Sequence, residues 1–316
     1  MQSLLFKPQV PLVVADGLGV DSTAMLVGMH QRGMRPDLIL FADTGSEKQK
    51  TYDYLPVRQA YLASIGFPPV IVVRYEPKNF KNYPPYKSLG ENCLTNGTLP
   101  SLAFGFKSCS QKWKVAPQDA FVSEWVPALR CWALGGRVVK CIGYDDGPKD
   151  SKRYAHVEGY EDPRYEYRYP LREWHWDREE CIRQIRAAGL PVPCKSACFF
   201  CPATKPEELK ELSPENLRFI VAMEARAHPR LTAIDGLWRC GCKGTRGGVA
   251  KPGRMTDYIR AKGLLPAEEV DRLWQSIPKR IEEYQAAVQG GSPLADFLSA
   301  EDLQTEPPKP HEPDVV

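Results

Sequence analysis

Three cysteines share one short segment of the chain, as Cys194, Cys198 and Cys201. Thiolates at this spacing can bind a metal ion or an iron–sulfur cluster, and Cys109 supplies a fourth sulfur if the fold brings the two segments together. Both iron and zinc accept a tetrahedral set of four sulfurs. The spacing alone therefore leaves a [4Fe–4S] cluster, a structural Zn²⁺ and unligated thiols open.

A second pair of thiols lies in a cationic segment. Cys240 and Cys242 stand in residues 239–254, which hold five basic residues, five glycines and no acidic residue. Basic neighbours favour the thiolate, which is the nucleophile, so both thiols are candidate catalytic groups. The same segment can contact the phosphates of a nucleic acid. The alternative is a solvated surface loop with a structural cysteine pair.

A glycine-rich turn near the start of the chain offers a phosphate site. In VVADGLGVDSTAML an apolar run meets Gly17 and Gly19 and continues as a predicted helix. The glycines permit close approach of the backbone, the helix N-terminus presents N–H groups, and Ser22 and Thr23 carry hydroxyls. Asp21 or Ser22 can equally cap an ordinary strand-to-helix turn. The turn alone does not decide between the two.

Further candidate contacts for an anionic nucleotide follow along the chain. Asp43 and Thr44 end a predicted strand, where parallel sheets place ligand contacts. Lys112 and Lys114 suit a phosphate or sulfate, and Arg153 is a candidate phosphate clamp. The ordinary alternatives are a strand-terminating turn for the first two residues and solvated charge for the cations.

The elements that must position these residues alternate along the first part of the chain. Predicted strands cover residues 10–17, 37–45, 68–76 and 138–147. Predicted helices cover residues 21–33, 51–66, 116–133 and 177–191. Apolar strands separated by helices are typical of a mostly parallel sheet covered on both faces. We therefore expect a doubly wound α/β nucleotide-binding domain over residues 1–191.

The pattern changes after this domain. Helices are predicted over residues 206–228 and 266–289, whereas residues 77–110 read as irregular. We expect a Cys-rich, mainly helical and metal-binding region over residues 192–290. The Pro-rich and acidic composition of residues 291–316 predicts a disordered tail.

Composition limits the class of protein. With 316 residues and 43% hydrophobic content, the chain has the size of a globular enzyme. The formal charge of +3 is too balanced to require a nucleic-acid partner by bulk electrostatics. No apolar run approaches the roughly 18 residues of a membrane span, and Lys and Pro interrupt the first residues where a signal peptide is continuously apolar. We expect a cytoplasmic protein without a membrane partner.

Six segments, taken in order, resemble one superfamily. They are the glycine-rich turn with its Asp-Ser pair, FADTGSEKQKTYDYL, SCSQKWKVAP, IGYDDGPKDSKR, YPLREWHWDREECIRQIRAAGLP and CFFCP. Together they resemble the PP-loop ATP pyrophosphatases, within them the phosphoadenosine phosphosulfate (PAPS) reductase-like family, which includes phage and DNA-phosphorothioation-type reductase-like proteins. The resemblance covers about residues 13–202 and implies an adenine nucleotide alpha-hydrolase-like fold.

The resemblance also implies ligands. It implies ATP, or an adenylylsulfate-type nucleotide, with Mg²⁺, and a [4Fe–4S] cluster with Zn²⁺ as the alternative. The implied nucleotide-binding residues are Gly17, Gly19, Asp21, Ser22, Thr23, Asp43, Thr44, Lys112, Gly143 and Arg153. The implied metal ligands are Cys109, Cys194, Cys198 and Cys201.

The chain departs from the reductases at three places. Gly17 and Leu18 replace the usual Ser-Gly of the loop, Ser110 breaks the double cysteine at Cys109, and the terminal Glu-Cys-Gly-x-His motif with its attacking thiol is absent. The departures favour an enzyme that uses ATP over a reductase.

Three functions follow from these observations. In the first, a substrate oxygen attacks the α-phosphate of ATP, pyrophosphate leaves and sulfur then displaces the adenylate, with Asp21 and Ser22 in the catalytic loop. In the second, Cys240 or Cys242 attacks the sulfur of adenylylsulfate or its 3′-phosphorylated form, and sulfite is released. The third is a non-catalytic nucleotide-binding module with structural zinc. The sulfur donor remains unidentified, and the candidate acceptors are DNA, RNA or a small molecule.

Overall fold

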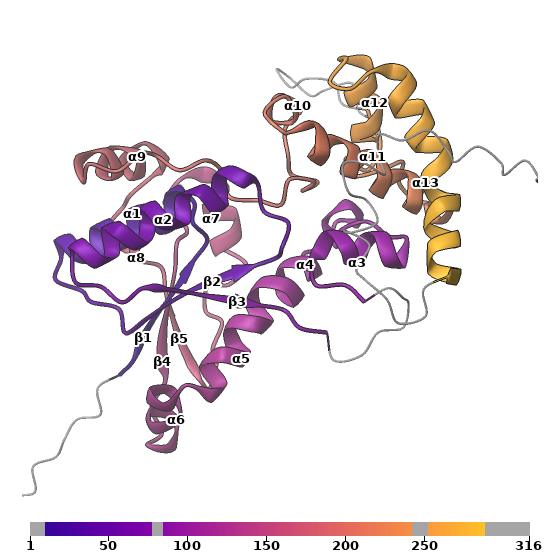
Figure 1. Cartoon of the computed structure of the whole chain (residues 1–316). Coiled ribbons are helices and arrows are strands. Elements are labelled where there is room, and N and C mark those ends of the chain that lie inside the picture. The colour runs from indigo at the N-terminus through magenta and orange to yellow at the C-terminus, as the bar shows by residue number, and fades with distance from the viewer. Residues whose placement is uncertain (1–9, 78–84, 242–251, 288–316) are drawn as a thin grey trace, which may run out of the picture. The chain divides into compact units, whose positions relative to one another are not determined.

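The computed structural model describes residues 10–77, 85–241 and 252–287, and the chain divides into two compact units (Figure 1). The first unit comprises Met1–Glu76 and Ser108–Cys198. The second comprises Pro77–Lys107 and Phe199–Val316. Residues 85–107 therefore pack with helices that lie far from them in the sequence.

A five-stranded sheet forms the centre of the first unit, and every neighbouring pair of strands is parallel. The strands are β1 (Leu12–Asp16), β2 (Leu38–Asp43), β3 (Val70–Arg74), β4 (Val138–Ile142) and β5 (Tyr165–Arg168). Their order in the sheet is β3-β2-β1-β4-β5. The chain thus winds outward from β1 in one direction and then from β4 in the other. The switch between the two directions lies at the carboxyl ends of β1 and β4.

Helices cover both faces of this sheet, as expected for a doubly wound α/β fold (Figure 1). The helices are α1 (Val20–Gln31), α2 (Gln49–Ser64), α4 (Ser108–Ser110), α5 (Ala116–Glu124), α6 (Val126–Ala133), α7 (Pro148–Tyr154), α8 (Pro170–Glu173) and α9 (Arg178–Ala187), and a π-helical turn spans Gln111–Val115. On one face Val14 packs with Met25 of α1 and Ile185 of α9. On the other, Val13 packs with Val122 of α5. The alternation along β1 shows that the central strand is buried from both sides.

The sequence predictions missed elements at two places in the chain. The edge strand β5 was not predicted, because its sequence Tyr-Glu-Tyr-Arg has no apolar run. The segment 77–110, predicted to be irregular, contains α3 (Leu89–Asn96) and a 3-10 turn (Ser101–Phe104). Helix α3 begins with a capping box, in which the Ser88 hydroxyl accepts from the Glu91 N–H at 3.1 Å.

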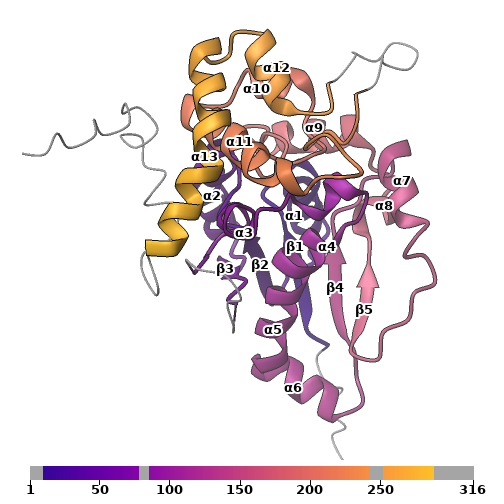
Figure 2. The same cartoon turned by 90° about the vertical axis from the view of Figure 1, so that its right-hand side faces the viewer.

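The second unit is helical in its described residues. Besides α3 it contains α10 (Pro206–Leu209), α11 (Pro214–Ala227), a 3-10 turn (His228–Arg230), α12 (Met255–Ala261) and α13 (Ala267–Ala287). Helix α11 packs against α13 and α3, and Figure 2 shows α11 beside α13. The helix predicted over residues 206–228 is interrupted, because Ser213 caps a new helix in which Pro214 takes the first position.

A buried carboxylate joins separate segments of the second unit. Glu224 is fully buried on α11 and accepts hydrogen bonds from the N–H groups of Leu237, Met255 and Thr256 at 2.7, 3.0 and 2.8 Å. The Thr256 hydroxyl adds a bond at 2.6 Å. Both ends of the undescribed segment 242–251 are thereby tied to α11. No helix among the described residues has the length and apolar character that crossing a bilayer requires.

One ion pair is buried inside the first unit. The Asp16 carboxylate at the end of β1 lies 2.8 Å from the Arg58 guanidinium of α2, and both side chains are at most 1% exposed. Arg58 also donates to the Thr23 hydroxyl of α1. The pair therefore links the central strand to the two helices that flank the glycine-rich turn.

We expect Arg58→Met to lower the free energy of unfolding by about 3–5 kcal/mol, because Asp16 would keep a buried charge without its partner. Urea denaturation followed by circular dichroism measures the change. The matched control is Arg260→Met, since Arg260 and Asp271 form a solvent-exposed pair. Equal effects of the two substitutions would contradict the role assigned to the buried pair.

Candidate functional site

The glycine-rich turn between β1 and α1 is held by its own hydrogen bonds. Leu18 is fully buried and has a positive φ of 56°, and its N–H donates to Asp16 Oδ1 at 2.8 Å. The Gly17 N–H donates to Ser22 Oγ, and the Ser22 hydroxyl donates to the Gly19 carbonyl, both at 3.3 Å. A non-glycine residue in the left-handed region costs free energy, so these bonds and the burial of Leu18 fix a strained loop.

Thr23, predicted to contact nucleotide, faces the interior. It is 1% exposed, donates to the Gly19 carbonyl at 2.6 Å and accepts from Arg58. Its hydroxyl therefore holds the first turn of α1 in place. Asp21, two residues earlier, directs its carboxylate toward the carboxyl end of β4.

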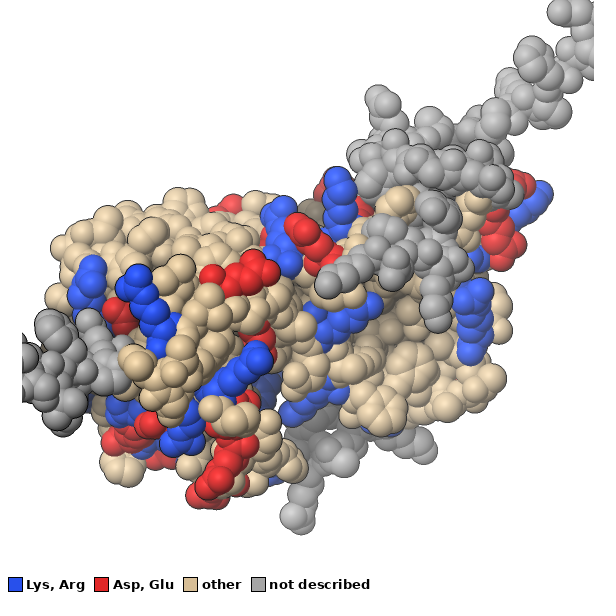
Figure 3. Space-filling view, turned by 90° about the horizontal axis from the view of Figure 1, so that it is seen from below, with Lys and Arg blue, Asp and Glu red and all other residues tan. Residues whose placement is uncertain are grey.

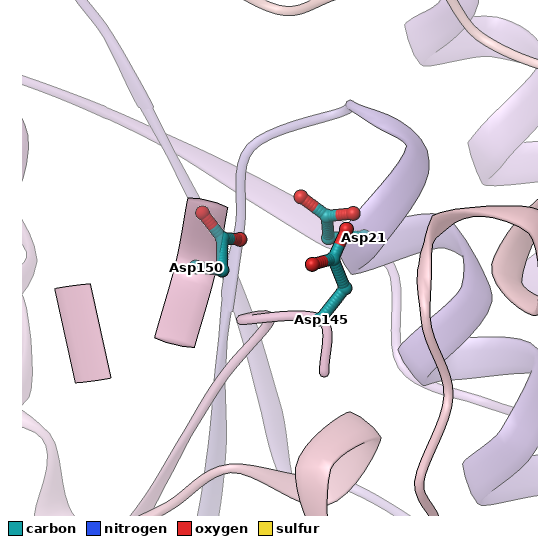
Figure 4. A group of neighbouring side chains, drawn as sticks. All are labelled: Asp21, Asp145 and Asp150. Carbon is teal, nitrogen blue, oxygen red and sulfur yellow. The ribbon is translucent and has the colours of Figure 1, made fainter. Parts of the chain in front are cut away.

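Three carboxylates meet at the switch point of the sheet. Asp21 of α1, Asp145 of the loop after β4 and Asp150 of α7 each place one oxygen within 4.8 Å of the other two (Figure 4). Asp145 and Asp150 are buried, and Asp21 is half-buried. In open parallel sheets this position, outside the carboxyl ends of the strands, is where ligands bind. Of the three, only Asp21 was predicted from the sequence as a site residue.

Two arginines balance part of this negative charge. Arg178, the first residue of α9, lies 2.9 Å from Asp21 and 3.3 Å from Asp145. Arg153, the predicted phosphate clamp, lies 3.1 Å from Asp150 and is half-exposed. Among the described residues, Asp150 Oδ2 is a buried oxygen without a hydrogen-bond partner. The site thus retains a carboxylate oxygen available for a ligand.

The protonation of Asp21 responds to this environment. Burial raises the pKa of Asp21 from 3.8 to about 6. The Arg178 guanidinium opposes the rise in this pKa, while Asp145 and Asp150 add to it. The folded protein therefore holds the charged form of Asp21 at a cost in free energy.

Gly143, also predicted to contact nucleotide, determines how closely β4 approaches α1. A Cβ atom at this position would lie 3.1 Å from the Asp21 carbonyl carbon and 3.1 Å from the Ser22 nitrogen. Backbone atoms of a helix cannot move aside as a flexible side chain does. Gly143 therefore allows the end of β4 to pack against the residue that carries the first carboxylate.

This group of oxygens fits a divalent cation. Mg²⁺ and Mn²⁺ prefer carboxylate oxygen ligands, and Mg²⁺ retains several waters while sharing its remaining positions with phosphates. The close spacing of the three carboxylates and the buried, unpartnered oxygen of Asp150 meet this requirement. The residues that would hold Mg²⁺ are therefore Asp21, Asp145 and Asp150.

The end of β2 is organised differently. Asp43 accepts hydrogen bonds from the Tyr52 hydroxyl and the Gly45 N–H, each at 2.8 Å, and from the Arg74 guanidinium at 2.8 and 3.0 Å. Thr44 is buried, donates to Glu47 Oε1 at 3.4 Å and lies 3.3 Å from Cys198 Sγ. The side chains of Asp43 and Thr44 thus hold the loop that follows β2.

Two cysteines of the predicted metal site, Cys194 and Cys198, lie beside the loop after β2 and the start of α2. The Lys48 N–H donates to the Ala197 carbonyl at 3.2 Å, and Cys194 Sγ lies 3.8 Å from the Thr51 hydroxyl. A Cβ atom placed on Gly19 would lie 3.4 Å from Ser196 Cβ. The segment 194–198 therefore runs between the loop after β2 and the glycine-rich turn.

The other two predicted metal ligands belong to different units. Cys109 is half-buried on α4 in the first unit, and Cys201 belongs to the second unit.

The remaining predicted groups are exposed or lie outside the described residues. Lys112 is exposed, with its Nζ 4.9 Å from the centre of the Tyr75 ring, whereas Lys114 pairs with the buried Glu47 at 2.7 Å. Cys240 is exposed in the second unit. Cys242 and the predicted tail over residues 291–316 lie outside the described residues.

Comparisons with known proteins add a likeness to solved structures. No protein-family model and no curated protein matches the chain. Among solved structures, it is similar to the PAPS reductase from Candida auris in complex with phosphate, with 21% sequence identity and a TM-score of 0.37. The alignment covers 58% of this chain and 75% of the reductase. The fold described above follows from the sheet order and does not depend on this likeness.

We expect Asp21→Asn to raise the free energy of unfolding at pH 8, without divalent cations, by about 2–3 kcal/mol. Because the pKa of Asp21 is raised, its charged form lowers the stability of the folded protein by the full amount above about pH 6. This loss of stability decreases toward pH 4, where the carboxyl group becomes protonated in the unfolded chain as well as in the folded one. The difference between variant and wild type should therefore shrink on acidification, as measured by denaturation at both pH values. A destabilised variant at pH 8 would contradict the raised pKa.

Proposed function

We propose that this chain is an enzyme of the PP-loop, PAPS reductase-like type, which binds ATP and catalyses adenylating sulfur transfer. The observation that carries the proposal is the group of three carboxylates, Asp21, Asp145 and Asp150, beside the glycine-rich turn at the switch point of the sheet. Attack at a phosphate that carries several negative charges requires neutralisation of those charges. A site for a divalent cation at the phosphate cradle suits that reaction.

The residues of the chain take separate roles in this proposal. The backbone N–H groups at the start of α1 bind the phosphates, and Gly17 and Gly19 keep the cradle open to them. Arg153, with its half-exposed guanidinium, contacts a phosphate oxygen. A Mg²⁺ held by the three aspartates would neutralise charge on the phosphates as pyrophosphate leaves.

The proposed reaction has two steps. An oxygen of the acceptor attacks the α-phosphorus of ATP, the bond to the β-phosphate breaks, and pyrophosphate leaves with the electron pair of that bond. A sulfur nucleophile then attacks the acceptor carbon and displaces AMP. The acceptor is DNA, RNA or a small molecule. On the face shown in Figure 3, Lys and Arg lie among Asp and Glu and do not form a patch of one sign.

The alternative is a reductase that releases sulfite from adenylylsulfate or its 3′-phosphorylated form. That reaction needs a nucleophilic thiol, and the exposed Cys240 is a candidate for it, as is Cys242. The reductase cleaves a bond between sulfur and oxygen, so no pyrophosphate leaves. A divalent cation at the phosphates would then have less developing negative charge to neutralise. The group of three carboxylates therefore favours the enzyme that uses ATP.

We further propose that Cys109, Cys194, Cys198 and Cys201 hold a [4Fe–4S] cluster, with structural Zn²⁺ as the alternative. Cys194 and Cys198 belong to the segment 194–198, whose Ser196 lies against the glycine-rich turn, and this supports a metal centre near the nucleotide. Such a cluster would supply a centre for binding sulfur or transferring electrons.

We expect the protein to release pyrophosphate and AMP from ATP in the presence of Mg²⁺, slowly until an acceptor is supplied, since binding energy from the acceptor helps to form the transition state. Asp150→Asn should reduce the rate at least about 100-fold, as loss of a group that stabilises transition-state charge does. Enzyme-coupled detection of pyrophosphate measures the rate.

The matched control for this measurement is Asp53→Asn, because Asp53 is an exposed acidic residue of α2 that lies outside the group. Sulfite formed with a thiol reductant and lost in Cys240→Ser, without pyrophosphate from ATP, would instead establish the reductase.

We expect anaerobically purified protein to be brown, with broad absorbance near about 400 nm and sulfide close to four per chain, as a [4Fe–4S] cluster requires. Cys194→Ser and Cys198→Ser should lose this absorbance, whereas Cys181→Ser, at a buried thiol of the sheet core, should keep it. Iron, zinc and sulfide are quantified on the same sample. Colourless protein with one zinc per chain would move the site to a structural role.

A further inference from the structure

A cavity of about 470 Å³ opens in the first unit beside the carboxyl end of β5. Its volume lies within the range of about 300–1,000 Å³ that small-molecule sites occupy. Four tyrosines line it, Tyr154, Tyr160, Tyr167 and Tyr169, together with Arg168 and Arg172 and three acidic side chains. None of the residues predicted from the sequence to bind nucleotide lies in this lining.

The tyrosine rings present flat surfaces to the cavity at fixed angles. Tyr169 stacks on Tyr144 with ring centres 5.5 Å apart and an angle of 21° between the planes. Tyr154 and Tyr169 form a T-shaped pair with ring centres 5.1 Å apart, and the Arg172 guanidinium lies 4.5 Å from the centre of the Tyr154 ring. Tyr160 lies 6.1 Å from Tyr167 and is 62% exposed. Such rings can receive another flat ring from solvent.

The charges of the lining argue against an anion as the ligand. Arg168 pairs with Glu173, and Arg172 pairs with Asp146 at 3.0 Å, so each cation in the cavity already has a carboxylate partner. Glu158 adds a third negative charge. A sulfate or phosphate group would gain little from this balance, whereas an uncharged ring with both donor and acceptor groups finds partners for both.

The cavity adjoins the group of three carboxylates. Asp146 of the lining follows Asp145 of that group in the sequence. Arg172 donates to the Asp145 carbonyl and to the Ser151 hydroxyl, each at 3.1 Å. A flat ligand in the cavity would therefore be held next to the place proposed for the phosphates.

We propose that this cavity binds a nucleobase, stacked on the tyrosine rings with its polar edge toward the arginine and carboxylate groups. Bases stack on tyrosine regardless of their identity, and their edges carry donors and acceptors together. The base belongs either to the nucleotide or to a nucleic-acid acceptor. The assignment of the base to a nucleic-acid acceptor rests on the proposed function. The inference that a base stacks in this cavity does not.

The test measures binding without turnover by titration calorimetry. Its probes are ATP, inorganic tripolyphosphate and a short single-stranded oligonucleotide of mixed sequence. The variants are Tyr160→Ala, at an exposed ring whose loss spares the core, and Tyr169→Leu, with Tyr169→Phe as the conservative form. Phe106→Ala is the matched control, because Phe106 is 67% exposed in the second unit and does not line the cavity.

We expect Tyr160→Ala and Tyr169→Leu to weaken binding of one base-containing probe about tenfold, while Tyr169→Phe and Phe106→Ala bind like wild type. Tripolyphosphate should bind all variants equally, because it has no base. A loss confined to ATP identifies the adenine of the nucleotide as the occupant. A loss confined to the oligonucleotide identifies a base of the acceptor.

Three results would overturn the inference. The first is that the tyrosine variants bind ATP and the oligonucleotide as tightly as the wild type does. The second is that they lose tripolyphosphate binding in parallel. The third is that the wild type binds neither ATP nor the oligonucleotide. Absence of pyrophosphate release is a separate result, which would contradict the proposed reaction and leave the base-binding measurement as it stands.

Discussion

The burial of one carboxylate at the end of β1 determines how the rest of the site is arranged. Asp16 and Arg58 are both buried in the first unit, so loss of Arg58 would leave the carboxylate without its partner, and Arg58 in turn holds Thr23 at the start of α1. The second oxygen of Asp16 accepts from Leu18 and stabilises its left-handed backbone. Because both ends of the glycine-rich turn are fixed in this way, Asp21 reaches the carboxyl end of β4.

Most of the fold could be predicted because four of the five strands are apolar runs separated by helices. Strand β5 could not, since an edge strand needs fewer apolar residues, and in β5 only Tyr165 is buried while the next three side chains are exposed or half-exposed. The packing of residues 85–107 with later helices depends on contacts between residues far apart in the chain. Periodicity within a short window contains no information about such contacts.

The candidate site was only partly accessible from the sequence. Asp21 lies in a recognisable turn, but Asp145 and Asp150 join it because the sheet order places β4 next to β1. The acidic residues at the end of the fourth predicted strand, residues 138–147, and just beyond it were a usable signal. Asp43 and Thr44 show the reverse situation, in which short polar side chains at a strand end bond to the protein itself. A sequence does not distinguish these two uses of the same residue types.

The position of Arg178 has a consequence for the order in which ligands bind. Its guanidinium lies against Asp21 and Asp145 and so competes with any cation that approaches those oxygens. If a phosphate attracts Arg178, the carboxylates lose their internal counter-ion and gain affinity for a metal. By thermodynamic linkage the metal then raises the affinity for the phosphate by the same factor. The two ligands would bind with positive cooperativity, and the empty protein would be protected from adventitious metal.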